Sequence, residues 1–158
     1  MYIDFENLLS SSQALTATAL STNVIDLGVD RSIGNGEPMG VLFTVIVAAD
    51  QGTGDEDYTF DVEYASNSGI TTARKLVGRR LFESGTPDAP LLDADLLVAG
   101  FRFVIPVPPT SLSESERYIA VRYTLAGTTP TITVSAALLP LSFISQNSPL
   151  YASGYSIT

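Results

Sequence analysis

Strict alternation of apolar and polar residues is the feature that most limits what this chain can fold into. In residues 57–64, every even position from Tyr58 to Tyr64 is aromatic or branched and apolar, and the positions between them are polar. Successive side chains of a β-strand point to opposite faces, so a period of two predicts a strand with one buried face. Residues 117–126 and 131–139 repeat the pattern. The sequence therefore predicts a protein built from β-sheets.

Further strands are predicted at other places along the chain. Residues 39–49 carry apolar side chains on both faces, which is typical of a central strand. Shorter candidates are residues 23–27, 75–82 and 100–105, which gives about seven strands, and one more in the tail would make eight. Residues 91–99 have room for one or two helical turns, started by Asp93 or closed by Gly100.

Many short strands separated by Gly-, Pro- and Asn-rich turns predict an all-β fold, an antiparallel β-sandwich of the jelly-roll kind. The longer connection over residues 83–99 suits a Greek-key crossover between sheets. We expect a single domain over residues 23–139, with an N-terminal arm over residues 1–22 and a C-terminal tail over residues 140–158. A chain of 158 residues is long enough to bury one core.

The absence of two residue types limits the kinds of catalytic and metal site that this chain can form. The chain has no cysteine and no histidine, so it lacks the groups that form Ser-His-Asp and Cys-His triads and ordinary zinc sites. We therefore expect a protein that is not an enzyme, with no catalytic residue, no bound cofactor and no metal.

Charge and hydropathy bear on partners and location. A net charge of -9 argues against binding to nucleic acid or to an anionic membrane surface. No stretch approaches the roughly 20 apolar residues that cross a bilayer. Asp4 and Glu6 lie where a signal peptide would be basic, so we expect synthesis in a cytoplasm, or incorporation into a particle assembled there.

Two groups of carboxylates could form a functional site or could simply be part of an acidic, solvated surface. The loop over residues 50–57 contains four acidic residues and two glycines, and could hold calcium, although its spacing is not that of an EF-hand. Asp61 and Glu63 lie on the same strand face, as the paired carboxylates of a glycosidase would. In both cases we favour the simpler prediction of a solvated acidic surface, because residues two apart on a strand are close by default.

The ends of the chain and its arginines predict a protein interface. Apolar residues are dense in the first nine positions and recur in the tail, where solvation would be unfavourable. Seven of the eight basic residues are arginine, which is enriched at protein interfaces, whereas lysine is depleted. Charged strand edges that block aggregation are the alternative for the arginines. The predicted interface residues are Tyr2, Ile3, Phe5, Leu8, Leu9, Arg74, Arg79, Arg80, Phe143, Leu150, Tyr151 and Tyr155.

Several segments resemble one family. Residues 12–28 contain Ser-Gln-Ala followed by Ser-Thr-Asn-Val-Ile-Asp-Leu-Gly; later come Gly-Glu-Pro-Met at 36–39, Glu-Arg-Tyr-Ile at 116–119 and Arg-Tyr-Thr at 122–124. In this order they resemble the capsid cement proteins of tailed bacteriophages of the Bordetella podophage type. The resemblance runs from about residue 5 to residue 140.

The resemblance implies a jelly-roll-like sandwich on the outer surface of an icosahedral head, made in the cytoplasm of the bacterial host. It implies a symmetric oligomer that clamps neighbouring major capsid protein subunits after the head expands, without enzymatic activity. The high apolar content and the lack of lysines that would protect strand edges predict that this oligomer is a homodimer or homotrimer. The alternative is a calcium-dependent carbohydrate-binding jelly roll on the phage surface that uses the acidic loop. The absence of tryptophan disfavours that alternative, since sugar-binding platforms favour large aromatic faces.

Overall fold

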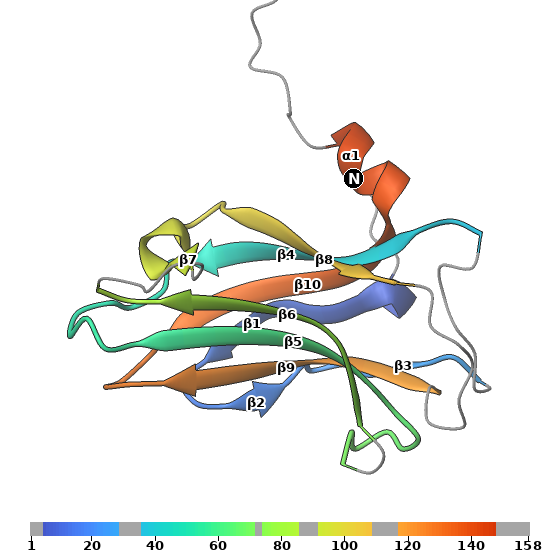
Figure 1. The fold of residues 1–158 in the computed structure, drawn as a ribbon, viewed down its shortest axis with the longest axis horizontal. Coiled ribbons are helices and arrows are strands. Elements are labelled where there is room, and N and C mark those ends of the chain that lie inside the picture. The colour runs from blue at the N-terminus through green and yellow to red at the C-terminus, as the bar shows by residue number, and fades with distance from the viewer. Residues whose placement is uncertain (1–4, 29–35, 72–73, 86–91, 109–116, 148–158) are drawn as a thin grey trace, which may run out of the picture.

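Two β-sheets face each other across an apolar core in the computed structural model (Figure 1). The structure describes residues 5–28, 36–71, 74–85, 92–108 and 117–147. The smaller sheet has four antiparallel strands, in the order β1 (Leu8–Leu15), β10 (Ile132–Pro140), β4 (Met39–Val47) and β8 (Arg102–Val107). The six-stranded sheet has the order β2 (Ala19–Leu20), β9 (Tyr118–Ala126), β5 (Asp57–Ala65), β6 (Lys75–Glu83) and β7 (Leu92–Asp93), and β3 (Ile25–Asp26) also pairs with β9.

The strands pair in a nested order. The first strand β1 pairs with the last strand β10, β2 and β3 pair with β9, β4 pairs with β8, and β5 pairs with β6. All of these pairs are antiparallel, while the short β7 runs parallel to β6. A long hairpin rolled up on itself gives this pairing, which is the connectivity of a jelly roll. The predicted fold class, an all-β antiparallel sandwich of the jelly-roll kind, is confirmed.

The core is filled by the inward face of each long strand. On β5, Tyr58 to Tyr64 point inward at every second position and are buried, as the alternation predicts. Aromatic rings from both sheets meet in the middle: Phe43 of β4 and Phe103 of β8 stack with centroids 4.7 Å apart, and both contact Phe60 of β5. Burial of each such side chain contributes about 1.5–3 kcal/mol to the stability of the fold, so the two sheets are firmly coupled.

Both open sides of the sandwich are closed. On one side β6 approaches β8 at Gly78, where a Cβ atom would lie 2.4 Å from Cγ2 of Ile105, so a side chain larger than hydrogen does not fit. On the other side Asn23 donates to the edge of β1, through its backbone N–H to the Leu9 carbonyl (2.9 Å) and through its amide to the Leu8 carbonyl (3.0 Å). Covered edges prevent strand-to-strand association without edge lysines.

The predicted N-terminal arm over residues 1–22 is wrong from residue 8 onward. Residues 8–15 form an edge strand of the four-stranded sheet, and Leu9 is fully buried in the core. The alternation is hidden in the sequence because the register of β1 shifts twice against β10, with Ser12 at a φ of 46°. The domain therefore begins well before the predicted boundary at residue 23.

The other predicted strands are confirmed with small changes of boundary, except that residues 23–27 contain only the two-residue strand β3. The crossover over residues 83–99 leads from the six-stranded to the four-stranded sheet. It contains the predicted helical turn, η2 (Ala94–Leu96), where the Asp93 carboxylate accepts a hydrogen bond from the Asp95 N–H at 2.8 Å. A second short turn, η1 (Phe5–Asn7), precedes β1.

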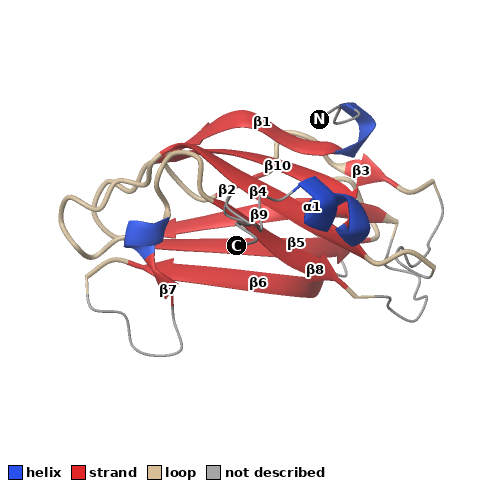
Figure 2. Cartoon of the chain, turned by 90° about the horizontal axis from the view of Figure 1, so that it is seen from above, coloured by secondary structure: helices blue, strands red, loops and turns tan. Residues whose placement is uncertain are grey.

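Within the predicted C-terminal tail, residues 141–147 form a helix, α1 (Leu141–Asn147), instead of a further strand. Figure 2 shows α1 on the outer face of the four-stranded sheet. A Cβ atom on Gly40 of β4 would lie 2.5 Å from the Leu141 side chain, so the helix begins where the strand has no side chain. None of the helices in the described part of the chain is long and apolar enough to span a membrane.

Candidate interaction surfaces

The outer face of the six-stranded sheet is a network of paired charges. Asp61 of β5 lies opposite Arg79 on β6 and Arg122 on β9. Arg79 donates to both carboxylate oxygens of Asp61, at 2.7 and 2.8 Å. This hydrogen bonding, together with the charge of Asp61, raises the pKa of Arg79 above its usual value. Planar two-point pairing of this kind fixes the side-chain geometry as well as the charge.

Glu63, two residues further along β5, lies between two arginines. Arg122 donates to it at 3.0 Å and also to the Ile70 carbonyl at 3.1 Å, while Arg74 lies 3.5 Å from the second carboxylate oxygen. Glu63 and Asp61 are both buried. Arginines therefore hold both members of the carboxylate pair suggested by the sequence, an arrangement that stabilises the sheet face.

The acidic loop between β4 and β5 is organised around Glu56. The carboxylate of Glu56 accepts hydrogen bonds from the backbone N–H groups of Thr53, Gly54 and Asp55, at 3.0–3.2 Å, and from the Thr53 hydroxyl. The bond from the Thr53 hydroxyl is the main cause that lowers the pKa of Glu56. All of these donors belong to residues 53–55, so the Glu56 carboxylate is directed into its own loop.

A neighbouring carboxylate of the loop braces the next turn of the sandwich. Asp55 accepts hydrogen bonds from the N–H (3.1 Å) and hydroxyl (2.9 Å) of Thr128, in the turn between β9 and β10. In the ranges that the structure describes, no three acidic side chains gather in a way that could hold a metal ion. Asp55 and Glu56 are thus occupied by the chain's own donors.

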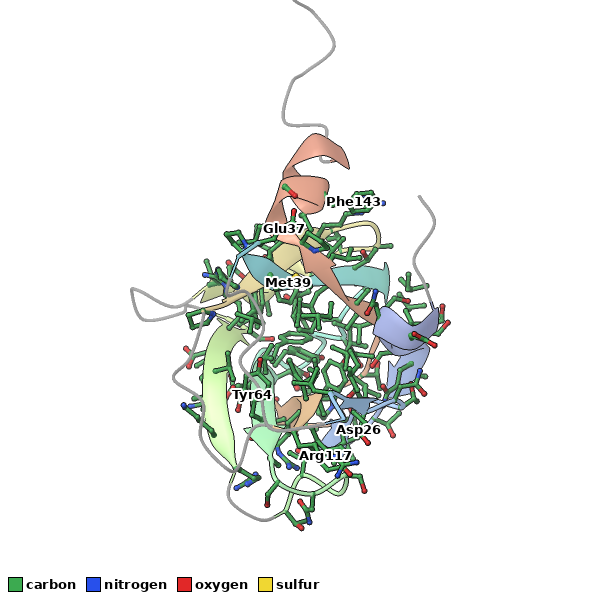
Figure 3. All side chains as sticks on the ribbon, turned by 90° about the vertical axis from the view of Figure 1, so that its right-hand side faces the viewer. Asp26, Glu37, Met39, Tyr64, Arg117 and Phe143 are labelled. Carbon is green, nitrogen blue, oxygen red and sulfur yellow. The ribbon has the colours of Figure 1, made fainter. Side chains whose placement is uncertain are left out.

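A further ion pair lies at the opposite end of the sandwich. Arg117 donates to both carboxylate oxygens of Asp26, at 2.8 and 2.9 Å, and its guanidinium lies 5.0 Å from the ring centre of Tyr118 (Figure 3). Chiefly because of the hydrogen bond from Arg117, the pKa of Asp26 falls to about 2. A groove with both polar and apolar walls adjoins this ion pair. It is lined by Glu6, Asn7, Val24, Ile25, Asp26, Leu27, Met39 and Leu138.

The outer face of the four-stranded sheet has a different chemistry. Leu42 of β4 and Ala137 and Leu139 of β10 are buried there under side chains of α1 and the flanking strands, among them Phe143 (Figure 3). A small cavity of about 30 Å³ adjoins this cluster, lined by Leu8, Leu42, Thr44, Ser135, Ala136 and Ala137. At the far end of β4, Ile46 and Val47 are 42% and 57% exposed. This face is uncharged apart from Arg102 on β8, among the described strand residues.

The predicted interface residues whose side chains the structure describes fall into three groups. Leu9 belongs to the domain's own core, so its prediction as an interface residue is wrong. Arg74, Arg79 and Arg80 are exposed on or beside β6, and the first two also pair with Glu63 and Asp61. Leu8 and Phe143 lie half-buried on the outer face of the four-stranded sheet.

The remaining predicted interface residues cannot be placed. Phe5 falls within η1, but its side chain lies outside the described part. Tyr2, Ile3, Leu150, Tyr151 and Tyr155 also lie outside the described residues.

Several polar residues with clear structural roles were not predicted from the sequence. The Ser10 hydroxyl lies 2.8 Å from the buried hydroxyl of Tyr123, whose pKa is raised by burial. The Gln13 side chain of β1 contacts β2 and the chain just after it, donating to the Leu20 carbonyl and accepting from the Thr22 N–H. These contacts depend on pairing between distant strands, and the available signal was that Ser10 and Gln13 lie within an otherwise small and apolar stretch.

The chain was compared with known protein families and with curated proteins. A family model described as Bbp16, a family of Bordetella phage type, matches residues 9–138. The match begins within β1 and ends within β10, so it spans the sandwich from its first strand to its last. No curated protein matches the chain.

Proposed function

The chain belongs to the Bbp16 family, and on this basis we propose that it is a structural protein of a bacteriophage particle that works as a capsid cement. It binds the outer surface of the expanded head and clamps neighbouring major capsid protein subunits. The family match over residues 9–138 is the observation that carries the proposal, because it covers the whole sandwich and joins the chain to phage proteins.

The physical character of the molecule supports this role. A cement protein must resist the outward pressure of packaged DNA, and many copies of a modest contact achieve this by avidity. A sandwich closed on both sides presents its contacts on a rigid body, so little free energy is lost in ordering them. A net charge of -9 favours a position outside the shell, away from the phosphates of the packaged DNA.

The proposal includes the absence of enzymatic activity. The carboxylates that could suggest chemistry are engaged by arginines, at Asp61 and Glu63, or by the loop's own donors, at Asp55 and Glu56. We also propose that the protein is a homodimer or homotrimer, made in the cytoplasm of the bacterial host and then bound to the outside of the head. Neither nucleic acid nor a membrane is a partner in this proposal.

Binding to purified heads tests the proposal. Expanded heads lacking this protein are mixed with increasing amounts of it, and the copies retained after sedimentation are counted. We expect saturation at a number fixed by the symmetry of the shell, and much weaker binding to unexpanded heads. Failure to bind expanded heads, or binding that never saturates, would overturn the cement role.

A further inference from the structure

We propose that two copies of this chain associate about a two-fold axis through one end of the sandwich, where β4 ends beside η2. The inference rests on the proposed function in one respect, since it locates the contact between copies of the cement protein. Three features of this end support it: exposed apolar side chains, an arginine without a carboxylate partner and an aspartate side chain without a donor.

Exposed apolar side chains are concentrated at this end. The described part of the chain exposes few large apolar side chains, and four of them lie here: Ile46 (42% exposed), Val47 (57%), Leu96 (43%) and Val98 (54%). We call these four residues the end patch. Large exposed apolar groups gathered at one place on a protein are typical of an interaction site.

The backbone brings the two segments of the end patch together. The Ala49 N–H donates to the Leu97 carbonyl at 3.0 Å, and the Gly100 N–H donates to the Val45 carbonyl at 2.8 Å. The end of β4 therefore runs beside the chain that follows η2, as Figure 1 also shows. Leu97 is fully buried, which anchors this segment to the core. The end patch is thus held on a fixed part of the fold, so little free energy is lost in ordering it on association.

Arg102 of β8 borders the end patch. It lies opposite Thr44 of β4, and Ile46 is two residues further along the same strand, so the three side chains share the outer face of the sheet. Four of the six arginines in the described part of the chain pair with a carboxylate: Arg74, Arg79, Arg117 and Arg122. Arg102 is exposed and makes no ion pair with any described residue. Its guanidinium can therefore receive a carboxylate from another molecule.

Asp95 of η2 is the matching carboxylate at this end. It is exposed, and its side chain accepts no hydrogen bond from the residues that the structure describes. Two other aspartates near the end patch differ in this respect. Asp50 accepts from the Gly52 N–H at 3.0 Å, and Asp93 accepts from the Asp95 N–H at 2.8 Å.

A surface with an apolar centre, an unpaired cation and an unpaired anion is complementary to itself. In a two-fold interface, if residue i contacts residue j of the other copy, then j also contacts i. Arg102 of each copy then meets Asp95 of the other, and the two end patches cover each other. Two such ion pairs also oppose the repulsion between copies that each carry a net charge of -9. This balance of charges indicates a second copy as the partner.

Exchange of the two charges, in solution and without any heads, tests the pairing. Arg102→Glu and Asp95→Arg are made in separate full-length chains. The mass of each variant, and of an equimolar mixture of the two, is measured by light scattering over a range of concentrations. In the mixture, Glu at position 102 of one copy faces Arg at position 95 of the other, and the native pair forms at the second contact. Melting curves check that each variant is folded.

We expect the dimers of each variant alone to be at least about tenfold weaker than those of the parent protein, because like charges then face each other at both contacts. The mixture should recover dimers close to the parent in strength, because both ion pairs form again. A monomeric parent protein, or a mixture that dissociates as readily as the separate variants, would overturn the proposal.

Distances between copies test the end patch itself. Because the chain has no cysteine, a single nitroxide label can be attached at Val98→Cys, in the end patch, or at Leu76→Cys, a similarly exposed residue near the start of β6. Electron paramagnetic resonance should place the Val98 labels of two copies within roughly 30 Å, the length of a nine-residue strand, and the Leu76 labels farther apart. The reverse order, or no coupling between copies in either variant, would overturn the proposal. Because these assays contain no heads, they can fail while head binding succeeds, and the reverse.

Discussion

Gly127, in the turn after β9, packs against the acidic loop too closely for any side chain. A Cβ atom there would lie 2.3 Å from the Asp55 carbonyl oxygen and 2.7 Å from Cα of Glu56. Its φ of +94° also lies in the region that favours glycine. Together with the bonds from Thr128 to Asp55, this contact joins two turns at one end of the sandwich.

Gly127→Ala should therefore lower the free energy of unfolding by about 2–3 kcal/mol, since it adds a backbone clash to the strain of a positive φ. Gly54→Ala is the matched control, because Gly54 has a φ of +73° with open space around it, and should lose about 1 kcal/mol. Urea denaturation measures both. Equal losses would show that the clash is relieved by movement of the loop.

Asp26 gives a pH dependence whose direction can be stated. Its pKa is lowered by Arg117 from an ordinary 3.8 to about 2, so the folded state favours the ionised carboxylate. The stabilisation is present above pH 4 and is lost as the pH falls towards 2. We expect Asp26→Asn to melt slightly below the parent protein at pH 7 and equally at pH 2. A difference that persists at pH 2 would assign the effect to packing.

The hydrogen bonds of Glu56 and Asp55 predict how the protein responds to removal of metal ions. Because N–H and hydroxyl groups of the chain already occupy these carboxylates, the melting temperature should not change when EDTA is added. Differential scanning calorimetry with and without chelator makes the comparison. A fall of several degrees that calcium reverses would support the calcium-dependent carbohydrate-binding alternative.

Among the elements, β1 shows that the domain begins well before the boundary predicted at residue 23. It forms one edge of the four-stranded sheet, and its first two leucines face opposite ways. Leu9 is fully buried in the main core, whereas Leu8 is half-buried in the small cluster on the outer face. The N-terminal segment therefore contributes to the stability of the sandwich directly.

Leu9→Ala should destabilise the fold by about 2–5 kcal/mol, as is usual when a core leucine is truncated and a cavity remains. Leu8→Ala should lose about 1 kcal/mol, since its side chain is already partly solvated. Chemical denaturation of the two variants measures both losses of stability and so distinguishes a core leucine from one on the outer face. Similar small losses in both variants would mean that β1 is an arm after all.

The contrast between β1 and β5 explains how far the sequence predicts the fold. Strand β5 alternates without interruption and was predicted almost to the residue, and so were β4, β6, β9 and β10. The serines of β1 give no apolar period, and the shift at Ser12 breaks the register that a pattern would need. Two-residue strands such as β2 and β7 are too short to show any period.

The candidate surfaces were less predictable, because they depend on register between distant strands. Asp61 and Arg79 were each noted in the sequence, but their pairing follows only from the alignment of β5 with β6. The uncharged outer face likewise needs the order of the strands, since β1, β4 and β10 come from three distant parts of the chain. Composition could predict a protein interface, but not its position.

At the scale of the whole molecule, the two outer faces of the sandwich differ in charge, and we expect them to differ in role: one stabilises the fold and the other associates with neighbouring copies. Paired charges cover the six-stranded sheet, while the four-stranded sheet is largely uncharged and carries exposed Ile46 and Val47. Copies with a net charge of -9 repel one another, so they associate best through the face with the fewest charges.

We therefore expect a dimer or trimer in solution, with two or three times the chain mass of 16.8 kDa by light scattering. Val47→Lys should shift the population towards monomer, since it places a charge on the uncharged face. Leu76→Lys, at an exposed leucine of the other sheet, is the control and should leave the mass unchanged. A monomer that persists at all concentrations would contradict the expectation.

The nested pairing of the strands also determines when a newly made chain can finish folding. Leu8 near the start of the chain lies opposite Ala137 near its end, so the four-stranded sheet cannot close until β10 has emerged from the ribosome. Domains dominated by such distant contacts fold slowly, in milliseconds to seconds, because long loops must close before any contact is gained. The uncharged outer face of this sheet does not exist before that step. Copies still being translated therefore lack the surface through which finished copies would assemble.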